Sequence, residues 1–161
     1  MTPKSTRAAT GSAKKKKGKD RTGAAKHTHE LIIASRLPQI AKVEPFLKKV
    51  NGELHLDEVQ FHKLMIATTE AVNNGMIHGN RRDPKKKVSV ICEVNPRGIT
   101  VRVKDQGAGF EVEDVPMPLQ EERMLEENGR GIFLMRVLMD KVEFSRSPEG
   151  SEVVMKLNKQ K

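Results

Sequence analysis

The spacing of apolar residues after residue 30 alternates between the period of a strand and the period of a helix. The stretch ELIIASRL, residues 30–37, predicts a short strand. Pro38 follows it and suits the first turn of a helix. The next apolar positions recur at helical spacing, at Ile40, Val43, Leu47 and Val50. A helix is therefore expected from about Pro38 to Asn51-Gly52.

A second helix is predicted directly after the first. Asp57 is a suitable N-cap, because its side chain can accept a backbone N–H from the first turn, and Gln60 stands three residues later. Positions at helical spacing continue the pattern at Phe61, Leu64, Met65, Thr68 and Val72. This helix is expected to end near Gly79, so it contains the polar stretch EAVNNGMIHGN at 70–80.

The second half of the chain predicts strands and one further helix. Residues 87–94 and 99–105 alternate apolar and polar positions around a turn sequence, which is typical of an antiparallel hairpin. Residues 131–144 start a helix at a glycine and pass into a strand, and residues 151–157 form a closing strand. These elements predict an α+β fold: a two-layer α/β sandwich in which three helices cover one face of a mixed, mostly antiparallel sheet.

Composition narrows the class of protein. A chain of 161 residues, 36% apolar and 32% charged, can bury one modest core, so one domain is expected. The sequence has no apolar run near the ~18 residues of a membrane span, and no apolar block follows the basic N-terminus as in a secretory signal. The single cysteine, Cys92, agrees with a reducing compartment. We expect a cytoplasmic protein with no membrane partner.

Positive charge is concentrated at the N-terminus. The first 30 positions hold nine Lys or Arg and two acidic residues, and so carry +7 of the formal net charge of +9. This segment has too few large apolar side chains to offset the entropy of ordering it. We expect residues 1–29 to be a disordered basic tail and residues 30–161 to be the folded domain. The tail either binds nucleic acid loosely or only solubilises the chain, and the basic run at 81–87 is expected to be a solvated loop.

Three polar residues in the second predicted helix are spaced four apart. Glu70, Asn74 and His78 would lie along one stripe of an α-helix. A carboxylate that accepts a proton, beside an amide oxygen that can bind a divalent ion, suits a Mg²⁺-bound phosphate chain. On this stretch alone, a hydrated helix face with a satisfied histidine is the favoured explanation.

A second candidate stretch, VKDQGAGF, places Asp105 at the end of a strand. Gly107 and Gly109 follow it and allow a tight turn and close approach of a flat ligand to the backbone. The carboxylate can then accept a hydrogen bond from an exocyclic amine of that ligand.

A third stretch, ENGRGIFLM, places Gly129 and Gly131 at the start of a helix. Free backbone N–H groups and the positive end of the helix dipole favour phosphate oxygens there. Arg130 adds a charged donor. Neither glycine pair matches the Walker or the Rossmann pattern.

Taken together, the three stretches resemble a known family. E-x-x-x-N on a helix, D-x-G-x-G after a strand and G-x-G before a helix resemble the ATP site of the GHKL superfamily of gyrase, heat-shock-chaperone, histidine-kinase and mismatch-repair ATPases. More narrowly, EAVNNGMIHGN, DQGAGF, GRGIFLMRVLMDKVEF and the final GSEVVMKL resemble the anti-sigma-factor serine/threonine protein kinases. The resemblance covers about residues 30–161.

The resemblance implies a role for each candidate residue. Glu70 matches the general base that activates the substrate hydroxyl, and Asn74 matches the Mg²⁺ ligand. Residues 111–128 match a lid over the nucleotide, which is expected to move. The positions that would contact ATP are Asn74, His78, Asp105, Gly107, Gly109, Gly129, Arg130, Gly131 and Ser151. His78 is equally explained as a capping or core-edge histidine.

Two positions depart from the family pattern. Asn80 stands where many relatives carry an aromatic residue, so a stacking contact is lost there or supplied elsewhere. Ser151 replaces a threonine and keeps the hydroxyl.

The leading functional hypothesis is an ATP- and Mg²⁺-dependent serine/threonine kinase. The resemblance implies that it phosphorylates an anti-anti-sigma (STAS-type) protein, sequesters a sigma factor and forms a homodimer. One alternative is a non-catalytic ATP-binding module that sequesters a partner. Another is the ATP-binding domain of a histidine kinase, suggested by the HEL sequence at His29–Leu31. The sequence does not identify the sigma factor or the phosphorylated partner.

Overall fold

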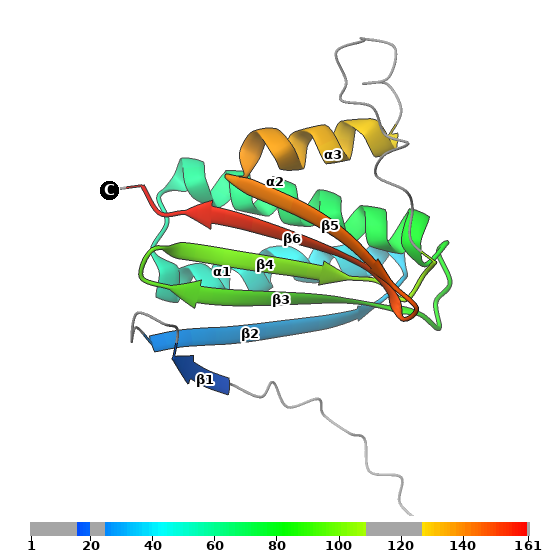
Figure 1. The fold of residues 1–161 in the computed structure, drawn as a ribbon, viewed down its shortest axis with the longest axis horizontal. Helices are drawn as coiled ribbons and strands as arrows, with labels where there is room; N and C mark the ends of the chain where they lie inside the picture. Colours follow the sequence, from blue (N-terminus) through cyan, green and yellow to red (C-terminus); the bar gives the residue numbers. More distant parts are fainter. Residues whose placement is uncertain (1–15, 20–24, 109–126, 161) are drawn as a thin grey trace, which may run out of the picture.

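The computed structural model describes residues 16–19, 25–108 and 127–160. Three α-helices, two shorter helical segments and six strands follow one another along the chain (Figure 1). In order they are β1 (Lys16–Lys19), β2 (Ala25–Ala34), the 3₁₀ helix η1 (Leu37–Lys42), α1 (Val43–Leu54), α2 (Glu58–Asn74), the π-helical turn η2 (Gly75–Gly79), β3 (Lys87–Asn95), β4 (Gly98–Lys104), α3 (Glu127–Leu138), β5 (Lys141–Ser147) and β6 (Gly150–Asn158).

The six strands form one sheet in the order β1-β2-β3-β4-β6-β5. Each of the described neighbouring pairs is antiparallel. Figure 1 shows the three α-helices behind the sheet, all on one side of it. The predicted α+β sandwich with helices on one face is confirmed, and the pairing of the described strands is antiparallel throughout rather than mixed.

The core lies between the sheet and the helices. In β3, buried and partly exposed positions alternate, and Val90 and Cys92 are fully buried. Their partners across the hairpin, Val103 and Val101, face the same side and are also buried. α1 and α2 cover this face with Leu47 and other apolar side chains. The period of two predicted for this hairpin therefore gives the sheet its inner face.

The N-terminal elements differ from the prediction at their ends. β2 begins at Ala25, inside the segment expected to be tail, because residues 27–34 pair with β3 along their whole length. The described part of that segment also includes β1, which pairs with the first residues of β2. The first predicted helix starts as the 3₁₀ turn η1 and becomes α-helical at Val43. It ends at Leu54, past the predicted Gly52, where His55 takes a left-handed conformation.

The second predicted helix has the start and end that the sequence indicated. The Asp57 side chain accepts the backbone N–H of Gln60 at 2.8 Å, as an N-cap does. The helix runs to Asn74 and continues through η2 to Gly79. The last turn is π-helical rather than α-helical, with the Asn80 N–H donating to the Gly75 carbonyl at 2.7 Å, five residues back.

Candidate functional site

α2 and α3 bring the first and third candidate stretches together. Gly131 of α3 lies directly over the side chains of Glu70 and Asn74 of α2. A Cβ on Gly131 would lie 2.8 Å from Glu70 Oε2 and 3.5 Å from either polar atom of the Asn74 amide. The absence of a side chain at residue 131 therefore keeps space open beside a carboxylate and an amide.

The second stretch is held in place by Asp105, which follows β4. Asp105 Oδ1 accepts the N–H of Gly107 at 2.9 Å and the N–H of Ser151 at 3.1 Å. The Asp105 N–H donates to the Ser151 carbonyl at 3.0 Å. Because the two backbone donors share Oδ1, Oδ2 is the oxygen left to accept a hydrogen bond from a ligand.

Two glycines approach Asp105 so closely that any side chain in their place would collide with it. A Cβ on Gly79 would lie 2.2 Å from Asp105 Oδ2, and a Cβ on Gly150 would lie 1.9 Å from the Asp105 carbonyl. Gly150 also has φ +140°, which favours glycine. A Cβ on Gly107 would lie 1.7 Å from the Gly79 carbonyl. The motif glycine Gly107 was predicted, whereas Gly79 and Gly150 were predicted only as element ends.

Two buried polar atoms at this site have no partner in the part of the chain that the structure describes. They are Asn74 Nδ2 and Ser151 Oγ. A buried donor or hydroxyl without a hydrogen bond costs ~1–3 kcal/mol. Such atoms fit a site that a polar ligand completes, and the family resemblance implies that Asn74 and Ser151 lie at the phosphate and adenine ends of bound ATP.

The same residues test whether Mg²⁺ fits. The Asn74 amide offers one oxygen of the hard type that Mg²⁺ prefers, next to the Glu70 carboxylate. Within the described ranges there is no group of three or more His, Cys, Asp or Glu side chains that could hold a metal ion. Protein-bound Mg²⁺ commonly takes few protein ligands and completes its shell with phosphate oxygens and water, so this site is compatible with the ion.

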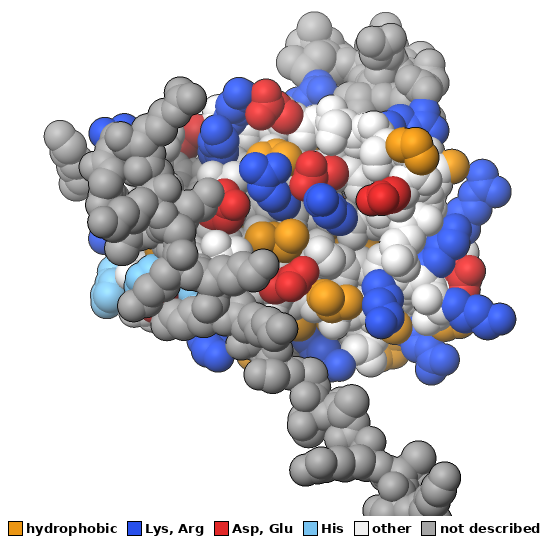
Figure 2. Space-filling view, turned by 60° about the horizontal axis from the view of Figure 1, so that its bottom comes forward, with side chains coloured by type: hydrophobic (Ala, Val, Ile, Leu, Met, Phe, Trp, Pro, Cys, Tyr) orange, Lys and Arg blue, Asp and Glu red, His pale blue; other side chains and the backbone are white. Residues whose placement is uncertain are grey.

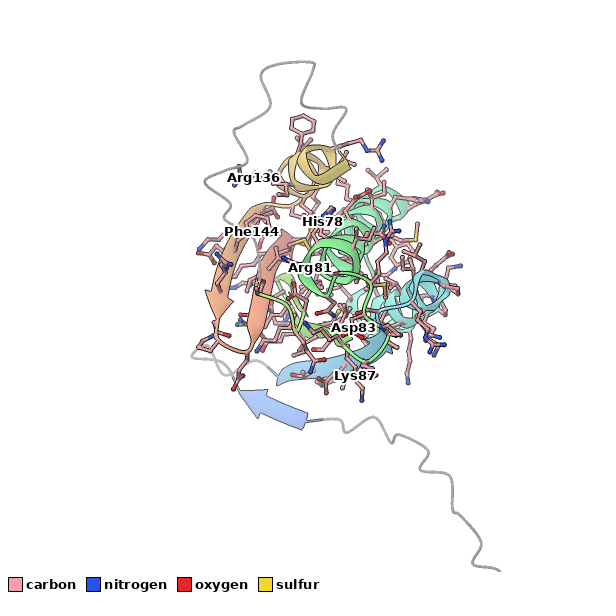
Figure 3. All side chains as sticks on the ribbon, turned by 90° about the vertical axis from the view of Figure 1, so that its right-hand side faces the viewer. His78, Arg81, Asp83, Lys87, Arg136 and Phe144 are labelled. Atoms are coloured by element: carbon pink, nitrogen blue, oxygen red, sulfur yellow. The ribbon has the colours of Figure 1, made fainter. Side chains whose placement is uncertain are left out.

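His78 lies on η2 and not on a continuing α-helix. A π turn contains more residues than an α turn, so it rotates His78 away from the line through Glu70 and Asn74 that was predicted. Figure 3 shows His78 at the same end of the molecule as Arg81, Asp83 and Lys87, along the connection from η2 to β3. Its part in binding ATP therefore remains a prediction.

The predicted glycine box belongs to the first two turns of α3. The helix begins at Glu127, four residues before the predicted start, so Gly129 lies in the first turn, where backbone N–H groups have no partner within the helix, and Arg130 and Gly131 follow it. Gly129 is buried and the Arg130 side chain is exposed. Their part in binding phosphate oxygens remains a prediction. Gly109 and nearly all of the predicted lid at 111–128 lie outside the described residues.

Asn80 is a site residue whose role the sequence did not reveal. It is fully buried and donates through Nδ2 to Ser35 Oγ at 2.7 Å and to the Lys87 carbonyl at 2.9 Å. Its Oδ1 accepts the N–H of Gln106 at 2.7 Å. The stacking contact considered at this position is therefore replaced by hydrogen bonds. A glycine-asparagine pair directly after a helix was the one signal in the sequence.

A cavity of about 600 Å³ on the face of the sheet away from the helices has Asp105 and Ser151 in its lining. Its lining includes Lys87, Lys104 and Glu152, but neither Glu70 nor Asn74. Figure 2 shows that charges of both signs are mixed with scattered apolar side chains on this face. The cavity therefore borders the Asp105 end of the site and not the Glu70 and Asn74 end.

The profile of the histidine kinase-like ATPase domain family matches residues 33–157. The chain belongs to this family. The match contains Glu70, Asn74 and Asp105 and so covers all three candidate stretches.

Curated relatives place this ATPase domain in the branch that contains the anti-sigma F factors. The anti-sigma F factor of Oceanobacillus iheyensis is 32% identical over 103 residues, which cover 62% of this chain and 69% of the relative. That of Anoxybacillus flavithermus is 33% identical over 111 residues, 66% of this chain and 75% of the relative. That of Clostridium beijerinckii is 29% identical over 120 residues, 73% of this chain and 76% of the relative.

Solved structures agree on the fold. The crystal structure of the RsbU and RsbW domains of a Mycobacterium tuberculosis protein superposes with a TM-score of 0.61 and 14% identity. That match covers 83% of this chain and 33% of the other. At such low identity the similarity concerns the fold of the ATPase domain alone.

The histidine kinase alternative depended on His29. In this ATPase domain His29 lies within β2, and its Nε2 is 3.2 Å from Glu53 Oε2. The side chain is only 11% exposed. A phosphoacceptor must reach the γ-phosphate, so a half-enclosed strand residue paired with a carboxylate does not favour this alternative.

Among the described residues, no helix is both long and apolar enough to cross a membrane.

Proposed function

We propose that this protein is a serine/threonine kinase and an anti-sigma factor that uses Mg²⁺-ATP to phosphorylate an anti-anti-sigma protein of the STAS type. The observation that carries the proposal is the placement of Gly131 over Glu70 and Asn74, which reserves space for a phosphate chain beside a carboxylate and an amide. The names of the curated relatives support the anti-sigma role.

Glu70 is the proposed general base. The hydroxyl oxygen of the substrate Ser or Thr attacks the γ-phosphorus of ATP, and its proton passes to a Glu70 carboxylate oxygen. A new O–P bond forms, the bond between the γ-phosphorus and its bridging oxygen breaks, and ADP leaves with the electron pair. The half-buried Glu70 reaches this space from the last turns of α2.

Asn74 and the start of α3 are proposed to hold the phosphates. Mg²⁺ supplies charge neutralisation on the phosphate oxygens when it is bound. Asn74 would be its protein ligand, and the buried Nδ2 without a partner would find an acceptor there. The Gly129 N–H and the positive charge of Arg130 would be directed at the phosphates, and Gly131 would leave room for them.

The adenine end is proposed to bind at Asp105. Oδ2 would accept the exocyclic amine, and the buried Ser151 hydroxyl would join through water, as the family resemblance implies. Gly107 and Gly109 would shape the pocket, and His78 would lie near the phosphates. Phosphorylation adds roughly two negative charges to the partner, which is enough to expel it from a close interface. We propose that this event switches the protein between its STAS partner and a sigma factor, as a cytoplasmic homodimer.

Phosphate transfer from radiolabelled ATP to a cognate STAS protein tests the kinase role. Glu70→Gln should lower the rate at saturating ATP by about a hundredfold, in the range seen for removal of a general base. Glu58→Gln, an exposed carboxylate at the start of the same helix, is the matched control and should keep the wild-type rate. Wild-type transfer by Glu70→Gln would show that Glu70 is not the base. ATP binding without any transfer would favour the non-catalytic sequestering module.

A further inference from the structure

Asn80 is a buried polar residue with every polar group of its side chain engaged. Its exposed fraction is 0%. Nδ2 donates to Ser35 Oγ and to the Lys87 carbonyl, and Oδ1 accepts from the Gln106 N–H. The side chain therefore joins the end of β2, the start of β3 and the loop that follows β4.

The Gln106 end of this network lies inside the proposed adenine pocket. Gln106 stands between Asp105 and Gly107, whose N–H donates to Asp105 Oδ1 at 2.9 Å. The Gln106 side chain returns to the sheet, where its Oε1 accepts the Lys87 N–H at 2.7 Å. The 105–107 loop is thus held by hydrogen bonds to both the backbone and the side chain of Gln106.

Gly79, next to Asn80, brings the two backbones into contact. A Cβ on Gly107 would lie 1.7 Å from the Gly79 carbonyl, and a Cβ on Gly79 would lie 2.2 Å from Asp105 Oδ2. Gly79 allows the two backbone segments to come close, and the hydrogen bond from the Gln106 N–H to Asn80 Oδ1 then fixes the distance between them. The π turn makes this possible, because its i to i+5 bond between the Gly75 carbonyl and the Asn80 N–H sets the position of Asn80.

We propose that Asn80 is a positioning residue for nucleotide recognition: it fixes the 105–107 loop so that Asp105 Oδ2 is presented to the adenine. This inference rests on the proposed ATP site. The Asp105 carboxylate should bind adenine more tightly when its loop is already ordered, because less conformational entropy is lost on binding. Asn80 does not contact the proposed phosphate end, so it should affect affinity for ATP and not the rate of phosphate transfer.

The test compares Asn80→Ala with Gln60→Ala in the full chain. Gln60 is a matched control, since it is a 3% exposed side-chain amide near the start of α2 and donates from Nε2 to the Asn158 carbonyl at 2.9 Å, away from the site. Both variants should lower the Tm. Asn80→Ala should weaken ATP binding in calorimetry about tenfold, the effect of losing one well-made hydrogen bond, with kcat within twofold of wild type. Gln60→Ala should leave the Kd unchanged.

Amide hydrogen exchange gives a readout that needs no nucleotide. The Gln106 N–H should exchange at least tenfold faster in Asn80→Ala than in Gln60→Ala. If Asn80→Ala does not fold, Ser35→Ala removes the acceptor of one Asn80 hydrogen bond and should also speed exchange at the Gln106 N–H relative to Gln60→Ala, by a smaller factor. Equal Kd values and equal Gln106 exchange in the two alanine variants would overturn the inference. Failure of the wild-type chain to bind ATP would instead overturn the proposed function, and the exchange comparison would still decide the role of Asn80 in holding the loop.

Discussion

Gly131 lies so close to the Glu70 carboxylate that a side chain at residue 131 would collide with it: a Cβ there would lie 2.8 Å from Glu70 Oε2. The two residues are far apart in the sequence and come from different helices, α3 and α2. Their contact gives the site its most specific geometric requirement.

Gly131→Ala should separate activity from stability. Alanine is favoured over glycine inside a helix by ~1 kcal/mol, so the free energy of unfolding should stay the same or rise. The new methyl group displaces Glu70 or enters the space for the phosphates, so the rate of phosphate transfer should fall at least tenfold. Enzyme assays and denaturant titrations on the same preparation measure both quantities.

Gly52→Ala is the control for that substitution. Gly52 is also helical, in α1, and an added Cβ would meet no atom within 4 Å. It should stabilise the protein by roughly 0.5–1 kcal/mol and leave phosphate transfer unchanged. Equal effects of the two glycine substitutions on activity would show that the contact between Gly131 and Glu70 is not functional.

Ser151→Ala should weaken ATP binding without destabilising the free protein. Ser151 Oγ is buried and has no hydrogen-bond partner among the described groups. Removing it therefore removes the free-energy cost of an unsatisfied buried hydroxyl. Thermal unfolding without nucleotide should give an equal or higher Tm. The stabilisation that ATP adds to this Tm should be smaller than in wild type, since the hydroxyl is proposed to contact bound nucleotide through water. A large loss of stability in the free protein would mean that the hydroxyl has a structural partner.

Cys92 should be inert in the folded protein. Burial raises the pKa of the Cys92 thiol to about 12, so at pH 8 the reactive thiolate is roughly one part in ten thousand. Iodoacetamide should label the native chain very slowly and the denatured chain within minutes. Because the folded pKa lies above the unfolded one, the thiol supports folding below about pH 8.5, and this contribution is lost as pH rises toward 12. Rapid labelling of native protein at pH 8 would contradict the buried position.

Local patterns were enough to predict much of this fold. The alternation in residues 87–105 predicted the central hairpin, and the Asp57 cap predicted the start of α2, because both depend on short-range chemistry. The start of β2 was missed, since a polar strand such as AKHTH acquires its structure from pairing with β3 and not from its own residues.

Only the site residues that belong to sequence motifs were predicted. Glu70, Asn74, Asp105 and Ser151 were predicted as site residues from spacing and resemblance. Gly79, Gly150 and Asn80 were not, because their roles arise from contacts with Asp105 and Gln106 that no sequence spacing encodes. The π turn was also missed, because EAVNNGMIHGN has the spacing of an ordinary helix end and nothing in it distinguishes an i to i+5 bond from an i to i+4 bond.

Calorimetric titration of the full chain with ATP, with and without Mg²⁺, tests the nucleotide site most directly. We predict binding in the micromolar range that requires Mg²⁺ and is weakened at least tenfold by Asp105→Asn and by Asn74→Ala, while Gln60→Ala binds as wild type does. Two results would contradict the assignment of Asp105 and Asn74, and with it the proposed kinase. One is that the wild-type chain binds no ATP, and the other is that all three variants bind ATP as tightly as the wild type does.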